Sequence, residues 1–264
     1  MLVKNLALCS FLVPFTLYAS VDCSVAAPQS PRDITKVQGE NPQSFPFAPA
    51  YSEMNLCNIH SHTSAENKGP GFSVKAKAGQ PSGYVCDGAD SLTAEELKDP
   101  FEGKGAFGNV KPGDTIEVHW VFSTCDAKPG KGLSSCVPEG CTDPKLRVEA
   151  QAFLLVNDPK ALKFDDFVLA NERVGGFYQP KQLPTGTGTP VSYLGSTTGV
   201  YYNDTVCSPA EVTWSVRPMC ARLDISSLEK WAREGNIFEE TESHGARELV
   251  EDLKLLSPIE NMKK

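Results

Sequence analysis

The sequence predicts a single, mostly β domain with long loops and a C-terminal helical tail. Runs rich in β-branched and apolar residues, each bounded by Gly, Pro or Asp, lie at 55–62, 114–122 and 147–157, as is typical of short strands. Gly- and Pro-rich stretches at 126–145 and 180–200 separate later elements, and ordered loops of that length are usually functional or tied by disulfides. Near the C-terminus, apolar residues recur at helical spacing.

The N-terminus predicts a signal peptide over 1–22. Lys4 precedes an apolar run at 6–18, and small residues follow at 19–20, which is the order of a secretory signal. Small residues at 25–27 offer a second cleavage zone, so the cut site stays open. The run is too short for a membrane span, which needs about 20 apolar residues, and no later segment approaches that length. A retained N-terminal anchor is the alternative.

The cysteines also favour export. Cys9 lies inside the predicted signal, and the others belong to the predicted domain at 23–264, at Cys23, Cys57, Cys86, Cys125, Cys136, Cys141, Cys207 and Cys220. An even set in an exported chain predicts disulfides, for which counting alone allows about a hundred pairings. A cysteine zinc site is disfavoured because the sequence has no Cys-x-x-Cys pair. We therefore expect a periplasmic or secreted protein.

The charge balance excludes one class of partner. The formal net charge is −8 at pH 7, whereas nucleic-acid binding needs clustered Lys and Arg. We expect no nucleic-acid partner and, after signal removal, no transmembrane segment.

The predicted strand in the middle of the chain has two unlike faces. Successive side chains of a strand point to opposite faces, so Glu117 and His119 share one of them. The other face is apolar and takes Ile116, Val118 and Trp120.

The last part of the chain predicts one more strand and then helices. A short β-like run lies at 212–216. Ser226 or Ser227 could cap a helix over 228–234, and the apolar spacing at 246–256 predicts a second helix. Together they form the expected helical tail.

Three of the four histidines form a candidate metal site. His60 and His62 share one strand face because they are two residues apart, and His119 is the obvious third ligand. Three neutral imidazoles around an open position are typical of catalytic zinc, although cobalt or cadmium would also fit. Glu117 could orient a ligand ring. The alternatives are hydrogen-bonded surface or core histidines and a solvated Glu117.

The segment around the histidine pair reads Met54-Asn55-Leu56-Cys57-Asn58-Ile59-His60-Ser61-His62-Thr63-Ser64-Ala65-Glu66. It strongly resembles the delta-class carbonic anhydrases, including their bacterial relatives. Further motifs are similar to alpha-class carbonic anhydrases in the same order along the chain: Gln29-Ser30-Pro31-Arg32-Asp33-Ile34, Glu117-Val118-His119, Tyr193-Leu194-Gly195-Ser196-Thr197-Thr198, and Cys207 followed by Val212-Thr213-Trp214.

This resemblance implies an alpha-carbonic-anhydrase-like fold with a central sheet. It also implies that His60, His62 and His119 bind Zn²⁺, with Glu117 as the partner that orients His119.

The resemblance implies three further roles. Glu66 would accept a hydrogen bond from a threonine hydroxyl in a gatekeeper pair. The threonine is Thr198 if the motif aligns without a gap and Thr197 if one residue is deleted. Cys23 and Cys207 match the positions of a family disulfide.

The chain departs from the family pattern near the predicted site. Asn67 stands where histidine is common, and no histidine precedes Met54 where an alpha-class proton shuttle would fall. We expect His244, in the predicted helical tail, to be a surface residue rather than a shuttle.

The implied activity is that of a zinc-dependent carbonate dehydratase, a hydro-lyase that reversibly hydrates carbon dioxide to bicarbonate by zinc-hydroxide attack. An apolar wall for carbon dioxide could come from Val121, Val148, Phe153 and Trp214. Without an evident shuttle we expect buffer-dependent turnover. The alternatives are a catalytically inactive anhydrase-like binding module and a zinc-dependent ester hydrolase.

Overall fold

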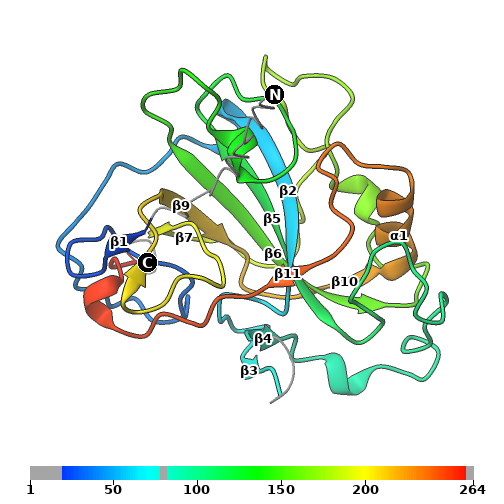
Figure 1. Cartoon of the computed structure of the whole chain (residues 1–264). Coiled ribbons are helices and arrows are strands. Elements are labelled where there is room, and N and C mark those ends of the chain that lie inside the picture. Colours follow the sequence, from blue (N-terminus) through cyan, green and yellow to red (C-terminus); the bar gives the residue numbers. More distant parts are fainter. Residues whose placement is uncertain (1–19, 78–81, 260–264) are drawn as a thin grey trace, which may run out of the picture.

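The computed structural model describes residues 20–77 and 82–259 (Figure 1). The predicted signal peptide therefore lies outside the described residues apart from 20–22. Residues 21–22 form the short strand β1 (Val21–Asp22), which pairs with β8 (Val206–Cys207).

The chain folds around one mixed sheet. Its path runs β11-β2-β5-β6-β9-β7, and β10 also pairs with β6. The bounds of these strands are β2 Asn55–Thr63, β5 Thr115–Ser123, β6 Leu146–Val156, β7 Val191–Ser196, β9 Glu211–Val216, β10 Ala221–Asp224 and β11 His244–Gly245. The predicted mostly β fold with a central sheet is confirmed.

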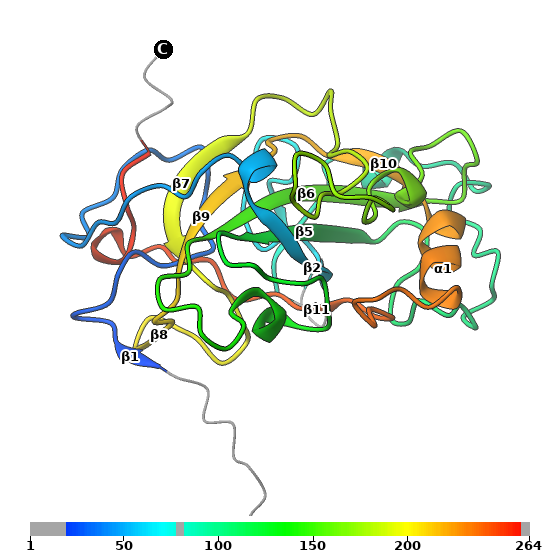
Figure 2. The ribbon, with the colours of Figure 1, turned by 90° about the horizontal axis from the view of Figure 1, so that it is seen from above.

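Short elements surround the sheet. A separate pair joins β3 (Val74–Lys75) to β4 (Tyr84–Val85). The described residues hold one α-helix, α1 (Ile225–Arg233), which lies toward one end of the sheet, whereas β1 and β8 lie beyond the other (Figure 2). Single 3-10 turns occupy Tyr51–Glu53, Ala89–Ser91, Leu133–Cys136, Phe164–Asp166 and Leu253–Leu255.

The two faces of the central sheet have separate cores. Ile116, Val118 and Trp120 pack into one apolar cluster, together with the buried face of α1. Val121 and Trp214 belong to the cluster on the other face. The predicted alternation along β5 is confirmed, and it sends Glu117 and His119 away from the core that holds α1.

The predicted helical tail is only partly correct. The helix α1 forms, but its N-cap is Asp224, whose carboxylate accepts from the backbone N–H of Ser226. Neither predicted serine is the cap, since the Ser227 hydroxyl instead donates to the backbone carbonyl of Asp224.

The predicted helix over 246–256 is wrong. This segment runs extended, apart from the 3-10 turn at Leu253–Leu255. Its apolar residues Val250, Leu255 and Leu256 pack beside the disulfide of Cys207, and Val250 N donates to the carbonyl of Pro31. Long-range contacts with the N-terminal segment thus override the helical spacing.

Four disulfides tie the described chain. They join Cys23–Cys207, Cys57–Cys136, Cys86–Cys220 and Cys125–Cys141. None of the helices in the described ranges has the length and apolar character needed to cross a membrane.

Candidate metal centre

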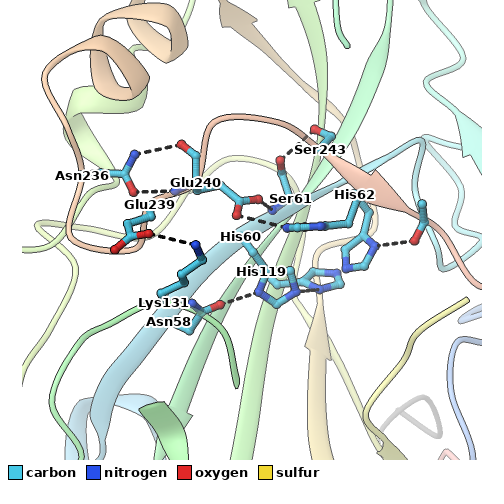
Figure 3. Close-up of polar contacts among 12 residues, drawn as sticks. Asn58, His60, Ser61, His62, His119, Lys131, Asn236, Glu239, Glu240 and Ser243 are labelled. Atoms are coloured by element: carbon cyan, nitrogen blue, oxygen red, sulfur yellow. Dashed lines mark hydrogen bonds and ion pairs between the residues drawn. The ribbon is translucent and has the colours of Figure 1, made fainter. Parts of the chain in front are cut away.

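Two neighbouring strands bring three histidines together. His60 and His62 lie on β2, and His60 is the direct cross-strand partner of His119 on β5. One ring nitrogen from each of the three lies within 4.8 Å of the others (Figure 3). Nε2 of His60 is 3.3 Å from Nδ1 of His119. Two nitrogen ligands of one tetrahedral zinc are separated by about the same distance, since each Zn–N bond is ~2.0–2.1 Å long.

The orientation of His60 is set by Asn58. The Asn58 amide nitrogen donates to the carbonyl of Gly130 at 3.0 Å, and its amide oxygen lies 2.7 Å from Nδ1 of His60 (Figure 3). Because a carbonyl can only accept, the amide oxygen must face His60, so Nδ1 carries the ring hydrogen. The Nε2 lone pair of His60 then points into the cluster, towards Nδ1 of His119.

The ring of His62 is held in a similar way, whereas Nε2 of His119 makes no hydrogen bond to any described residue. Nδ1 of His62 lies 3.1 Å from the carbonyl of Gly245 and must donate to it, which leaves Nε2 as the lone-pair nitrogen. That Nε2 is buried and has no hydrogen-bond partner in the described structure. Nε2 of His119 is also buried without such a bond, and Glu117 Oε2 lies 3.7 Å from it.

The electrostatic environment keeps the three rings neutral. Burial lowers the pKa of His62 to about 4, and it lowers the pKa values of His60 and His119 well below the usual range. Mutual repulsion among the rings adds to the effect for His60 and His119. Neutral imidazoles with free lone pairs are the form that binds a metal, and the described cysteines are all in disulfides. This donor set fits zinc.

A buried carboxylate lies next to the histidine cluster. Glu66 Oε2 accepts from the hydroxyl of Thr198 at 2.7 Å, and Oε1 accepts from the backbone N–H of Arg247 at 2.9 Å. Of the two threonines left open by the motif, Thr198 contacts Glu66, whereas Thr197 pairs with the Ser208 hydroxyl. Burial, followed by the charge of nearby Glu117, raises the pKa of Glu66 to about 8.

Glu117 is bonded mainly to backbone. Its carboxylate accepts from the N–H groups of Glu66 and Asn67 and from the Asn67 side chain. Burial raises the pKa of Glu117. Glu117 therefore fixes the turn after β2 on which Glu66 sits, and it lies close to His119 without a hydrogen bond to it.

Asn67, the residue that departs from the family pattern, is a buried polar residue next to Glu117. Its side-chain oxygen accepts from the hydroxyl of Tyr193 at 2.8 Å and from the backbone N–H of Arg32 at 3.2 Å. Asn67 is fully buried, and its hydrogen bonds to Tyr193 and Arg32 stabilise the turn after β2.

The apolar wall proposed from the sequence is partly wrong. Trp214 packs edge-on against His119, with ring centroids 5.1 Å apart, and shares a cluster with Val121 and Val148. Phe153 does not belong there. It pairs in register with Ile116 and lies in the opposite cluster, because it points to the other face of the sheet.

His244 is not in a helical tail. It lies on the edge strand β11, directly beside His62, and its ring centroid is 6.1 Å from those of His60 and His62. Its side chain is 52% exposed, and Nε2 lies 3.1 Å from Glu240 Oε2. The expectation of a surface residue is confirmed by this exposure, whereas the predicted helical setting is wrong, and the ring borders the cluster.

Sequence reasoning missed several residues that hold the site. Asn58 had a usable signal, since it lies two residues before His60 on the same strand face. Glu240, Gly245 and Arg247 had none, because they reach β2 and Glu66 across about 180 residues of chain.

Comparison with known proteins identifies the family of the chain. A family model described as delta carbonic anhydrase matches residues 51–227. No curated protein matches the chain. Among solved structures, the alpha-carbonic anhydrase from Thermovibrio ammonificans, in complex with the inhibitor sulfanilamide, is 16% identical, with 82% of this chain and 83% of that chain covered and a TM-score of 0.28.

Proposed function

The chain belongs to the delta carbonic anhydrase family, and we propose that it is a zinc enzyme that reversibly hydrates carbon dioxide to bicarbonate. The observation that carries this proposal is the convergence of three neutral imidazoles beside a hydrogen-bonded threonine–glutamate pair. Either feature alone has many uses in proteins, whereas their combination suits attack by a metal-activated water.

The zinc would be held through the ring nitrogens that face one another in the cluster. These are Nε2 of His60, Nε2 of His62 and Nδ1 of His119, which lies 3.3 Å from Nε2 of His60. When bound, zinc supplies a Lewis-acid centre that makes water nucleophilic near neutral pH. Glu117 would complete the support of His119 by accepting from its Nε2, which is 3.7 Å away.

Thr198 would orient the nucleophile. A hydroxyl has one hydrogen, and Thr198 donates it to Glu66. Towards any other partner its oxygen can therefore only accept. A water or hydroxide beside Thr198 would then donate its hydrogen to that oxygen and direct a lone pair at the substrate carbon.

Glu66 would keep Thr198 in this donating role. Its two oxygens are each engaged, one by Thr198 and one by the backbone N–H of Arg247, so the carboxyl cannot rotate freely. The Arg247 guanidinium donates to the carbonyl of Ser30 at 2.6 Å, which anchors the segment that carries this N–H.

The substrate side of the site would be apolar. Val121, Val148 and Trp214 lie on the sheet face of His119 and share one cluster. Carbon dioxide is small and has no hydrogen to donate, so an apolar surface beside the imidazoles suits it and excludes competing water.

We also propose that residues 23–264 form one exported domain after removal of a signal peptide at 1–22, in the periplasm or outside the cell. The four disulfides support an oxidising compartment.

The test is a carbon dioxide hydration assay beside an ester hydrolysis assay, each with and without a strong chelator. We expect hydration that the chelator abolishes and added zinc restores. Ester turnover without hydration would identify a zinc hydrolase instead. A folded protein that does neither would be an inactive binding module.

A further inference from the structure

The loop at 126–136 is fastened to β2 immediately before the histidine pair. The Cys57–Cys136 disulfide joins the two segments covalently. The carbonyl of Cys57 also accepts from Gly130 N at 3.0 Å and from the Ser135 hydroxyl at 2.8 Å. The next residue, Asn58, donates from its side chain back to the carbonyl of Gly130.

This fastening occurs at an irregularity of the sheet. The pairing of β2 with β5 shifts register between Leu56 and Asn58, so Cys57 is the extra residue of a β-bulge. A bulge leaves backbone groups of the extra residue outside the ladder and re-aims the side chains that follow. Here two groups of the loop at 126–136, Gly130 N and the Ser135 hydroxyl, donate hydrogen bonds to the carbonyl of Cys57.

The carbonyl of Gly130 sets the orientation of the Asn58 amide. That orientation in turn sets which ring nitrogen of His60 carries the hydrogen. With Gly130 in place, the Asn58 amide nitrogen faces the loop and the oxygen faces Nδ1 of His60. Without that carbonyl, the amide can flip and present its N–H₂ to Nδ1 instead. The ring hydrogen would then move to Nε2, which could no longer bind a metal.

A second contact of the loop, an exposed ion pair, contributes little to holding it in place. Lys131 and Glu239 form an ion pair of 2.9 Å across the site, but both side chains are about two-thirds exposed (Figure 3). Exposed pairs of this kind contribute little to stability, because water and salt screen the two charges. The disulfide and the contacts of Gly130 are therefore the connection that holds the loop against β2.

We propose that the Cys57–Cys136 disulfide is a positioning element of the metal centre, which acts through Gly130 and Asn58 to hold His60 in its metal-binding orientation. Asn58 is the positioning residue in this chain of contacts. The inference rests on the proposed zinc site and adds to it a dependence on one particular disulfide.

The test compares zinc affinity among variants of the full chain. One variant is C57A/C136A, the second is Asn58→Ala, and the third combines them. C125A/C141A is the matched control, because this disulfide joins residues on either side of the same loop. C86A/C220A is the control for loss of a long-range cross-link, since it spans 134 residues against 79 for Cys57–Cys136. Zinc affinity is measured by competition with a chromophoric chelator, and the ligand geometry by the visible spectrum of the Co²⁺-loaded protein.

We expect C57A/C136A and Asn58→Ala each to weaken zinc binding about 10- to 100-fold and to change the Co²⁺ spectrum. The combined variant should lose little more than the larger single loss, because both changes interrupt the same connection. The two control variants should bind zinc within about threefold of the unaltered protein.

Equal zinc affinity in C57A/C136A and in the controls would overturn the inference, and so would losses that multiply in the combined variant. If C57A/C136A does not fold, as near-UV circular dichroism reports, an unchanged affinity of Asn58→Ala would overturn it instead. The proposed function fails separately: zinc-loaded, unaltered protein without hydration activity would refute the enzyme but not the positioning role.

Discussion

Nε2 of His60 lies 3.3 Å from Nδ1 of His119, on strands that are direct neighbours in the sheet. The hydrogen bond from His60 Nδ1 to Asn58 makes this Nε2 a lone-pair nitrogen. The ring of His119 is buried and that of His60 is partly buried, and their lowered pKa values keep both neutral at physiological pH. In the metal-free protein the close approach requires His119 to carry its hydrogen on Nδ1 and donate it to Nε2 of His60. Under the proposed function, a zinc ion would take the place of this hydrogen and accept a lone pair from each ring.

Replacement of Thr198 should separate catalysis from metal binding. Thr198→Ala removes the hydroxyl that donates to Glu66, so a nucleophile loses its oriented acceptor. We expect kcat/KM for carbon dioxide hydration to fall about 100-fold with a full complement of zinc. Thr197→Ala is the matched control, because Thr197 pairs with Ser208 and should retain activity within a fewfold. Equal losses in the two variants would assign no special role to Thr198.

The pKa of Glu66 predicts how the stability of the metal-free protein changes with pH. Burial raises this pKa from 4.5 to about 8, so between these values the folded state binds a proton that the unfolded state does not. Stability that depends on this proton is therefore lost as pH rises towards 8.

Urea unfolding of the chelator-treated protein at pH 6.5 and pH 8 tests this sign. The unaltered protein should lose more stability over that interval than Glu66→Gln, since Gln resembles the protonated carboxyl at every pH. Parallel changes in the two proteins would show that Glu66 is not the group responsible.

Turnover should depend on the concentration of buffer. The segment before Met54 has no histidine to carry protons, and His244 already has its Nε2 engaged by Glu240. We expect kcat to rise with added imidazole-type buffer at constant pH and ionic strength. A rate independent of buffer would contradict this and would make His244, the half-exposed ring beside the cluster, the first residue to replace.

The strands and the histidine face could be predicted from the sequence because both depend on local periodicity. Alternation along β5 is a property of consecutive residues, and it placed His119 correctly. The same rule, applied across β6, separates Val148 from Phe153, since an odd spacing puts them on opposite faces. The spacing alone thus assigns Phe153 to the face opposite Val148, as the structure shows.

The surroundings of His62 and Glu66 could not be predicted in this way. The apolar spacing at 246–256 favours a helix locally, yet the segment packs extended against the N-terminal segment around Pro31. That long-range packing brings His244, Gly245 and Arg247 to the site. No local signal in the sequence carries it, and the same holds for the partners of Cys57 and Cys86.

The most direct test of the proposed site is the zinc content of His119→Ala, measured by atomic emission on protein purified with zinc present. His119 supplies the only proposed ligand outside β2, so its loss leaves two imidazoles, and structural or catalytic zinc normally needs three protein ligands or more. We predict about one zinc per chain in the unaltered protein and in His244→Ala, and almost none in His119→Ala, which should also lose hydration activity. Stoichiometric zinc in His119→Ala would contradict the ligand set on which the account depends.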